Sequence, residues 1–241
     1  MAVGPKLDLD YTESDARDFA ALFAGQASGN RLFKQVSVIT LLGDQATKTE
    51  IEQAVEHYDV MYRTENLHER DVLVLFFSTH GAMHDGRFYL KAEGYQPVMY
   101  RSTALQFEYV REILDAIPCK KLVLIDACQS GGARYASAAE INQALNVLDQ
   151  ARGTSVLVSS SETEYSYEDA RWQNGAFTEA LLEGLAQGRA DSDANSIITL
   201  GELSAYVQRR VPQLALQIGK QQHPRLASDQ LGGDMPLFLR R

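Results

Sequence analysis

Apolar residues form two kinds of pattern along the chain. Three short runs, 72–78, 122–125 and 155–158, are apolar without polar alternation, which is typical of strands buried on both faces of a sheet. A fourth run, 36–42, is rich in β-branched residues and also predicts a strand. Between these runs, apolar residues recur at helical spacing. The expected helices are 13–25, 47–63, 105–116, 176–186 and 200–217.

Strands that alternate with helices predict one α/β domain, residues 1–241, with a mostly parallel sheet between two layers of helices. Capping-box patterns begin at Thr12, Thr47 and Thr199, each followed three residues later by an acid. A turn and a short strand are expected over 84–90. The connection 131–152 reads as a flexible linker, and the carboxyl end from 219 as an irregular tail that folds back on the domain.

Composition narrows the possible partners. Hydrophobic residues make up 45% of the chain and charged residues 23%, which is enough for a substantial core. The net charge of -9 argues against binding to nucleic acid or to anionic membranes, and it suits a cationic partner. No apolar run approaches the ~20 residues of a membrane span, and no signal peptide is recognisable. With two cysteines and no disulfide framework, we expect a cytoplasmic protein.

Candidate chemistry lies where two buried strands end. One ends in "STHG", which contains Ser78, His80 and Gly81, and the other in "DAC", which contains Asp126 and Cys128. The carboxyl ends of parallel strands share one edge of a sheet, so the thiol and the imidazole should meet there. A nearby base activates a thiol as a nucleophile. The N–H groups of Gly81 and Cys128 could stabilise an oxyanion.

Each of these residues alone has a simpler interpretation. A single cysteine at a strand end is usually a small buried apolar residue, and a single histidine is usually structural. Together, at neighbouring strand ends, they favour catalysis. Cys119 has no such surroundings and is assigned to the core. The other histidines show no metal-binding spacing.

The segments STHG and LVLIDACQSGG resemble those of caspase-like cysteine peptidases, most closely the bacterial caspase-domain, metacaspase and paracaspase type. The segments 9–16 and 174–184 extend the resemblance over nearly the whole chain. It implies a sheet of about six strands and endopeptidase activity. Cys128 would attack the scissile carbonyl, and His80 would protonate the leaving amine. Family members begin with a full strand, whereas only residues 1–4 precede Pro5 here, so that strand could be missing, supplied by a preceding segment or removed by processing.

The resemblance also implies a substrate preference. Asp126 shares a strand face with Cys128, and in metacaspases and paracaspases the equivalent acid joins a second one, matched here by Asp15, in the pocket for the residue before the scissile bond. Two carboxylates would select Arg or Lys in protein substrates. Ser78 is expected to shape the same pocket. Either Glu162 or Glu164 could add a further acid. The alternative for Asp15 is a first-turn acid that complements the helix dipole.

An acidic pocket suggests self-cleavage as well. Arg134 and Arg152 lie in or at the end of the linker, and cleavage after one of them is expected; the alternative is a solvated loop. Relatives of this type often work with repeat or sensor modules, so a regulatory partner is also expected.

The segment "DSDANSIITLGE", residues 191–202, matches the EF-hand template at each ligand position. The expected calcium ligands are Asp191, Asp193, Asn195, the carbonyl of Ile197, Thr199 and Glu202. Ser196 replaces the glycine of the template, which makes the sharp turn harder. The alternative is an ordinary polar loop that ends in a capping box. Metacaspases bind calcium at a different acidic site.

Two rival functions are a non-catalytic caspase-like scaffold and a flavodoxin-like binding module. The first would not need both Cys128 and His80. The second would need a glycine-rich phosphate loop after an early strand, and the sequence has none.

Overall fold

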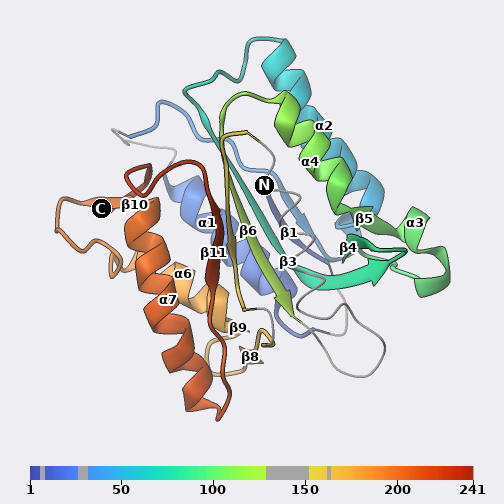
Figure 1. Cartoon of the computed structure of the whole chain (residues 1–241). Helices are drawn as coiled ribbons and strands as arrows, with labels where there is room; N and C mark the ends of the chain where they lie inside the picture. The colour runs from blue at the N-terminus through green and yellow to red at the C-terminus, as the bar shows by residue number, and fades with distance from the viewer. Residues whose placement is uncertain (6–8, 27–31, 129–151, 162–163, 241) are drawn as a thin grey trace.

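A central sheet runs through the middle of the molecule. The computed structural model describes residues 1–5, 9–26, 32–128, 152–161 and 164–240 (Figure 1). The strands follow the order β11-β7-β6-β3-β1-β2 across the sheet, and β11 alone on this path is antiparallel to its neighbour. Their bounds are β1 Ala2–Gly4, β2 Thr40–Leu42, β3 Val72–His84, β6 Lys120–Cys128, β7 Thr154–Val158 and β11 Arg225–Asp229.

Short strands extend the sheet and form two small antiparallel pairs apart from it. Strand β4, Arg87–Lys91, pairs with the last part of β3, and β5, Ala104–Gln106, pairs with β4. Separately, β8 (Glu168–Asp169) pairs with β9 (Asn174–Gly175), and β10 (Ile197–Thr199) pairs with β12 (Pro236–Leu239).

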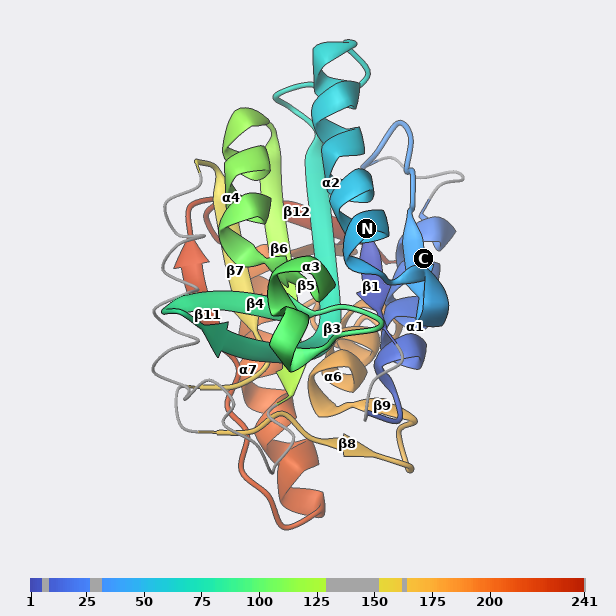
Figure 2. The ribbon, with the colours of Figure 1, turned by 90° about the vertical axis from the view of Figure 1, so that its right-hand side faces the viewer.

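Helices cover both faces of the sheet (Figures 1 and 2). On one face lie α2, Lys48–Arg63, and α4, Phe107–Ala116. On the other face lie α1, Thr12–Gly25, α6, Ala176–Ala186, and α7, Leu200–Gln217. The remaining short helices are η1 Gly43–Gln45, η2 Pro97–Met99 and α3 Tyr100–Thr103.

The two helical layers explain why the central strands carry continuous apolar runs. Phe77 and Val123 pack into the core under α2 and α4, whereas their chain neighbours Phe76 and Leu122 pack into the core under α1, α6 and α7. Successive side chains of a strand point to opposite faces, and here both faces are buried. The prediction of an α/β fold with a mostly parallel sheet is confirmed.

Helix boundaries agree closely with the expected ones, with one exception in the capping. The hydroxyl of Thr47 accepts a hydrogen bond from the N–H of Glu50 at 3.3 Å, so α2 begins as predicted. The box at Thr12 does not form, because Thr12 lies inside α1 and its hydroxyl donates to the carbonyl of Pro5 at 2.6 Å. This hydrogen bond instead ties the first turn of α1 to the residue that follows β1.

Three expectations about strands need correction. The first strand is present: β1 lies between β2 and β3, with Ala2 opposite Thr40 on one side and Phe76 on the other. Strand β2 covers only the end of the run 36–42. The carboxyl end is not irregular, because β11 closes one edge of the sheet against β7 and β12 pairs with β10. Strands β1 and β2 have only three residues each, too few to show alternation.

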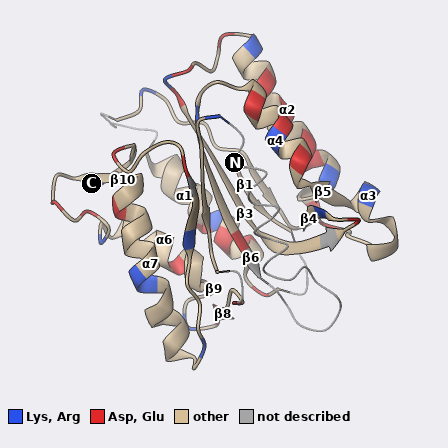
Figure 3. Cartoon of the chain, in the orientation of Figure 1, with Lys and Arg blue, Asp and Glu red and all other residues tan. Residues whose placement is uncertain are grey.

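Acidic residues are prominent on the outer helices, especially α2, as Figure 3 shows. Within the described part of the chain, no helix has the length and apolarity that crossing a membrane requires.

The close approach of β1 to the start of α1 provides a test of the packing. A Cβ atom at Gly4 would lie 2.1 Å from the carbonyl oxygen of Thr12, whereas one at Gly25 would meet nothing within 4 Å. We expect Gly4→Ala to lower the free energy of unfolding by about 1–3 kcal/mol, because the α1 backbone must move. The matched variant Gly25→Ala should leave it unchanged or raise it by up to ~1 kcal/mol. Denaturant unfolding measures both, and equal midpoints for the two variants would contradict this close approach.

Candidate active site

Parallel pairing of β3 with β6 brings His80 and Cys128 side by side. The register sets Ser78 opposite Asp126, Thr79 opposite Ala127 and His80 opposite Cys128. Neighbouring strands are ~4.8 Å apart, and residues in register point to the same face. The expectation that the thiol and the imidazole residues share one rim of the sheet therefore holds for the backbone. The side chain of Cys128 and the segment 129–151 lie outside the described residues.

The strand containing His80 is held firmly. The side chain of His80 is only 3% exposed, and the hydroxyl of Thr79 donates to the carbonyl of Lys91 on β4 at 2.6 Å. Beyond His80 the strand leaves β6 and forms a hairpin with β4. The hairpin turns at Asp85 and Gly86, which both have positive φ, of 51° and 71°.

Gly81 lies where β3 leaves β6. The packing at this position requires a glycine, and the strand pairing sets the direction of its N–H group. A Cβ atom at this position would lie 2.5 Å from the ring of Phe88. The pair His84–Arg87, next to the two-residue turn, is hydrogen-bonded, and hydrogen-bonded and non-hydrogen-bonded pairs alternate along an antiparallel ladder. Gly81 and Leu90, three pairs further on, therefore do not hydrogen-bond to each other. The N–H of Gly81 therefore points away from β4.

Behind this rim, two buried carboxylates converge. Asp15 on α1 and Asp126 on β6 are each 1% exposed. A Cβ atom at Gly175 would lie 2.7 Å from Oδ2 of Asp126 and 3.4 Å from Oδ2 of Asp15, so both carboxylates face the same stretch of backbone. The structure thus brings together the two acids that lie 111 positions apart in a chain of 241 residues.

The recorded hydrogen-bond donors to these carboxylates are neutral. Asp15 accepts from the hydroxyl of Ser78 at 2.8 Å and from the N–H of Gly175 at 2.9 Å. Asp126 accepts from the hydroxyls of Ser166 at 2.6 Å and Thr178 at 3.1 Å. Among the described residues, no Lys, Arg or His forms an ion pair with either carboxylate.

Negative charge on these buried carboxylates is therefore unfavourable in the absence of a cation. Burial, and then the neighbouring charge of Asp126, raise the pKa of Asp15 well above its ordinary value. Burial also raises the pKa of Asp126, although the hydroxyls of Ser166 and Thr178 oppose the shift. A cation that entered the pocket would reverse both effects, because it favours the ionised carboxylates.

A third acid, which the sequence reasoning missed, completes the cluster. Glu168 on β8 accepts hydrogen bonds from the N–H groups of Asp10 at 3.2 Å and Tyr11 at 3.3 Å. Burial raises the pKa of Glu168 to about 7, and the charge of Asp126 adds to this shift. The two hydrogen bonds act in the opposite direction but do not cancel it. No local signal marks Glu168, because only the β8–β9 pair brings it to the start of α1.

The sequence suggested Glu162 or Glu164, rather than Glu168, as the further acid of this cluster. Glu162 lies outside the described residues. Glu164 accepts from the hydroxyl of Ser161 at 2.9 Å, and from the backbone N–H and Nδ1 of His223 at 2.7 and 2.6 Å. Burial opposes the ionised form, but the hydrogen bonds from His223 and Ser161 outweigh it and lower the pKa of Glu164. Glu168, rather than Glu164, is the acid coupled to Asp126.

The carboxyl-terminal segment supports the wall of the pocket. The amide of Gln222, which is fully buried, donates to the carbonyl of Ser159 at 2.9 Å and to the hydroxyl of Ser166 at 3.0 Å. Its oxygen accepts from the N–H of Tyr167 at 3.0 Å. Gln222 therefore fixes the serine that in turn donates to Asp126.

The other predicted residues lie elsewhere. Arg134 falls outside the described residues, whereas Arg152 is exposed, and its N–H donates to Oδ1 of Asp115 at 3.3 Å. Arg152 precedes β7 at the amino ends of the strands, opposite the rim with Cys128. The acidic loop 191–202 lies between α6 and α7, near the carboxyl terminus (Figure 1). Cys119 is buried in the core, and burial raises its pKa to about 11.

Comparisons with known proteins agree with this architecture. The chain matches the caspase domain family, peptidase C14, over residues 4–235. Among solved structures it resembles protein GSU0716 from Geobacter sulfurreducens, with 18% identity, a TM-score of 0.61, and coverage of 93% of this chain and 90% of the other. It also resembles the Drosophila initiator caspase Dronc, with 13% identity, a TM-score of 0.55, and coverage of 94% and 74%. No curated protein matches the chain. The match to the caspase domain family shows that the flavodoxin-like alternative is wrong.

The raised pKa values make the stability of the ligand-free protein depend on pH. A carboxyl whose folded pKa exceeds its unfolded value binds more protons when folded, so the free energy of unfolding falls as pH rises. The loss should begin near about 4, the unfolded value, and continue through about 7, where Glu168 titrates. At pH 8 we expect Asp15→Asn to raise the free energy of unfolding by about 1–3 kcal/mol, measured by denaturant unfolding at several pH values.

Asp18→Asn, one turn further along α1, is the matched control and should keep the pH dependence of the wild type. A destabilised Asp15→Asn protein at pH 8 would show that the two carboxylates do not repel each other.

Proposed function

Because the chain belongs to the caspase domain family of cysteine peptidases, we propose that it is an active endopeptidase that cleaves proteins after arginine and, less readily, after lysine. The observation that carries the specificity is the buried pair Asp15 and Asp126, which has neutral donors and raised pKa values. Such a pair favours a cationic side chain over every other kind.

In the proposed mechanism, the thiolate of Cys128 attacks the carbonyl carbon of the scissile bond. His80 holds the thiol proton as an imidazolium and transfers it to the leaving amine, which breaks the C–N bond and leaves a thioester. Water then attacks the thioester while His80, now neutral, takes a proton from it. The C–S bond breaks, the acid product leaves, and the thiolate of Cys128 and the protonated His80 are restored. The in-register pairing of the two residues on adjacent strands supports this assignment.

The developing negative charge on the carbonyl oxygen needs donors that are already in place. The N–H of Gly81 points away from the β4 ladder by the register of the hairpin, and the N–H of Cys128 follows at the neighbouring strand end. These two groups are the proposed oxyanion donors. The ring of Phe88 against Gly81 holds the first of them in position.

The distance from nucleophile to pocket suits a long side chain. Asp126 precedes Cys128 by two residues, which span about 6.6 Å of strand, the scale of an extended arginine. The planar guanidinium has five N–H donors and can contact both carboxylates at once, whereas an ammonium is a single point of charge. Acidic side chains would be repelled by Asp15 and Asp126. Arginine should therefore be preferred over lysine, and both over acidic or apolar residues.

Peptides that differ only in the residue before the scissile bond test the proposal. With Arg, Lys, Asp and Leu at that position in fluorogenic substrates, we expect kcat/KM to fall in the order Arg, Lys, then Leu and Asp. Asp126→Asn should lower kcat/KM for the arginyl peptide by roughly 10²-fold, because a buried charge pair loses one partner, and by much less for the leucyl peptide.

Cysteine variants provide the controls for this assay. Cys128→Ala and His80→Ala should abolish cleavage, whereas Cys119→Ala should retain it, because Cys119 is buried away from the rim. Faster cleavage of the aspartyl peptide would disprove only the specificity. Equal rates for the wild type and Cys128→Ala would instead favour the non-catalytic scaffold.

The same preference makes the chain a substrate of itself, at Arg134 or Arg152. Incubation of the wild type at high concentration should yield two fragments whose intact masses place the cut after one of these arginines. The protein with Cys128→Ala should stay whole unless wild-type enzyme is added. A wild-type chain that remains intact while it cleaves arginyl peptides would disprove self-processing and leave the peptidase proposal untouched.

A further inference from the structure

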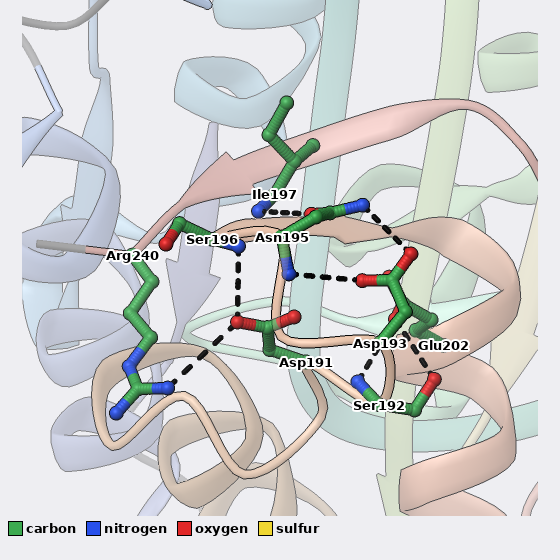
Figure 4. A network of polar contacts seen from close by, with 8 residues as sticks. All are labelled: Asp191, Ser192, Asp193, Asn195, Ser196, Ile197, Glu202 and Arg240. Carbon is green, nitrogen blue, oxygen red and sulfur yellow. Dashed lines mark hydrogen bonds and ion pairs between the residues drawn. The ribbon is translucent and has the colours of Figure 1, made fainter.

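A second group of carboxylates lies where the loop after α6 meets the first turn of α7. One oxygen from each of Asp191, Asp193 and Glu202 lies within 4.8 Å of the other two. Figure 4 shows these side chains gathered on one side of the loop that leads into α7. Three carboxylates at this separation repel one another unless a cation lies between them.

Asp191 supplies an independent sign of a missing partner. Its side chain is 1% exposed, and its Oδ2 accepts from the N–H of Ser196 at 3.1 Å and lies 3.7 Å from the guanidinium of Arg240. Its other oxygen, Oδ1, is buried and has no hydrogen-bond partner among the described residues. In Figure 4 this oxygen points toward Asp193 and Glu202. A buried carboxylate oxygen without a partner is unfavourable, and a metal ion would satisfy it.

The backbone of the loop has the shape that its sequence pattern requires. Ser196, at the position where the calcium-loop template has glycine, adopts a φ of 71°. The N–H of Asn195 donates to Oδ1 of Asp193 at 3.1 Å, and the N–H of Ile197 donates to Oδ1 of Asn195 at 2.6 Å. The serine therefore strains the turn without preventing it.

We propose that Asp191, Asp193 and Glu202 bind a calcium ion, with Asn195 and the carbonyl of Ile197 as further ligands. The ligand set consists of oxygen atoms alone, without His or Cys, which favours Ca²⁺ over zinc. The ligand positions in the twelve-residue segment 191–202 are those of a calcium loop.

Thr199, a ligand candidate from the sequence, has another role. Its hydroxyl accepts from the N–H of Glu202 at 3.3 Å, and one carboxylate oxygen of Glu202 accepts from the N–H of Thr199 at 3.0 Å. The other oxygen of Glu202 accepts from the N–H and the hydroxyl of Ser192, both at 2.9 Å. Glu202 thus caps α7 while it faces Asp191 and Asp193. The hydroxyl of Ser192 can rotate away when a cation approaches.

The position of the loop indicates what the ion would do. Asp191 contacts Arg240 near the carboxyl terminus, and β10 pairs with β12, so the loop joins α6, α7 and the last strand. Helix α6, with 11 residues, extends about 16 Å from Gly175 at the acidic pocket to the start of this loop. Calcium would therefore stabilise the fold at a distance from the reacting groups. This proposal does not depend on the peptidase activity.

Calcium binding to the full chain with Cys128→Ala, which prevents self-cleavage, tests the proposal directly. We expect saturable binding by isothermal titration calorimetry with a dissociation constant in the range of roughly 10⁻⁵ to 10⁻³ M. The Tm should rise with calcium concentration and change much less with the same concentrations of magnesium.

Variants separate ion binding from a purely structural role of the loop. Asp193 is exposed, and Asp193→Asn keeps an acceptor for the N–H of Asn195, so it should fold while its affinity for calcium falls at least tenfold. Asp44→Asn, at an exposed position in η1, makes the same change of charge and should bind calcium like the parent. Ser196→Gly should raise the affinity several-fold, because it removes the strain at positive φ.

Two results would overturn the proposal. One is the absence of both binding heat and a Tm shift up to about 10 mM calcium, tenfold above the weakest affinity expected for such a loop. The other is an unchanged dissociation constant in Asp193→Asn, whose folding is checked by circular dichroism and by its Tm in chelator.

Discussion

The register between β3 and β6 is the constraint on which the candidate active site depends. It pairs His80 with Cys128 at the rim and, two residues earlier, Ser78 with Asp126. A shift of one residue would turn each of these side chains to the opposite face of the sheet. The shift is prevented by the two cores, because Phe76 and Phe77 are buried on opposite sides of the same strand. Apolar packing thus sets the geometry of the proposed chemistry.

The two buried acids beside this rim, Asp15 and Asp126, lower the stability of the folded protein when they are ionised. Ser78, Ser166, Thr178 and the N–H of Gly175 supply hydrogen bonds to two buried acids but no positive charge. The buried Gln222 in turn holds Ser166, so the carboxyl-terminal segment helps to keep the acids in an unfavourable place. A basic side chain of a substrate, as the proposed function requires, would lower this cost by favouring the ionised carboxylates. Binding sites often retain local instability of this kind because substrate recognition uses it.

Features set by short-range patterns were predictable from the sequence. The central strands, α2 with its Thr47 cap, and the placement of His80 and Cys128 at neighbouring strand ends all follow from apolar runs and their borders. The missed features depend on contacts between distant segments. Glu168 reaches the start of α1 only through the β8–β9 pair.

Thr12 shows the same limit in a single residue. Its local pattern predicts a helix cap, but burial against the end of β1 gives its hydroxyl a different acceptor, the carbonyl of Pro5. The short strands β1, β11 and β12 likewise gain their stability from neighbours in the sheet rather than from their own composition.

The two acidic clusters near the ends of α6, Asp15 with Asp126 and the cluster that contains Glu202, differ in the direction in which their surroundings shift the pKa of the carboxyls. At Asp15 and Asp126, burial raises both pKa values, so protons can neutralise this pair when no cation is present. In the loop, burial opposes ionisation of Glu202, but hydrogen bonds from Thr199 and Ser192 outweigh it and lower its pKa to about 2. That carboxylate therefore stays charged at every physiological pH. Without a cation, the carboxyls of Asp15 and Asp126 tend to hold protons, whereas Glu202 keeps its negative charge.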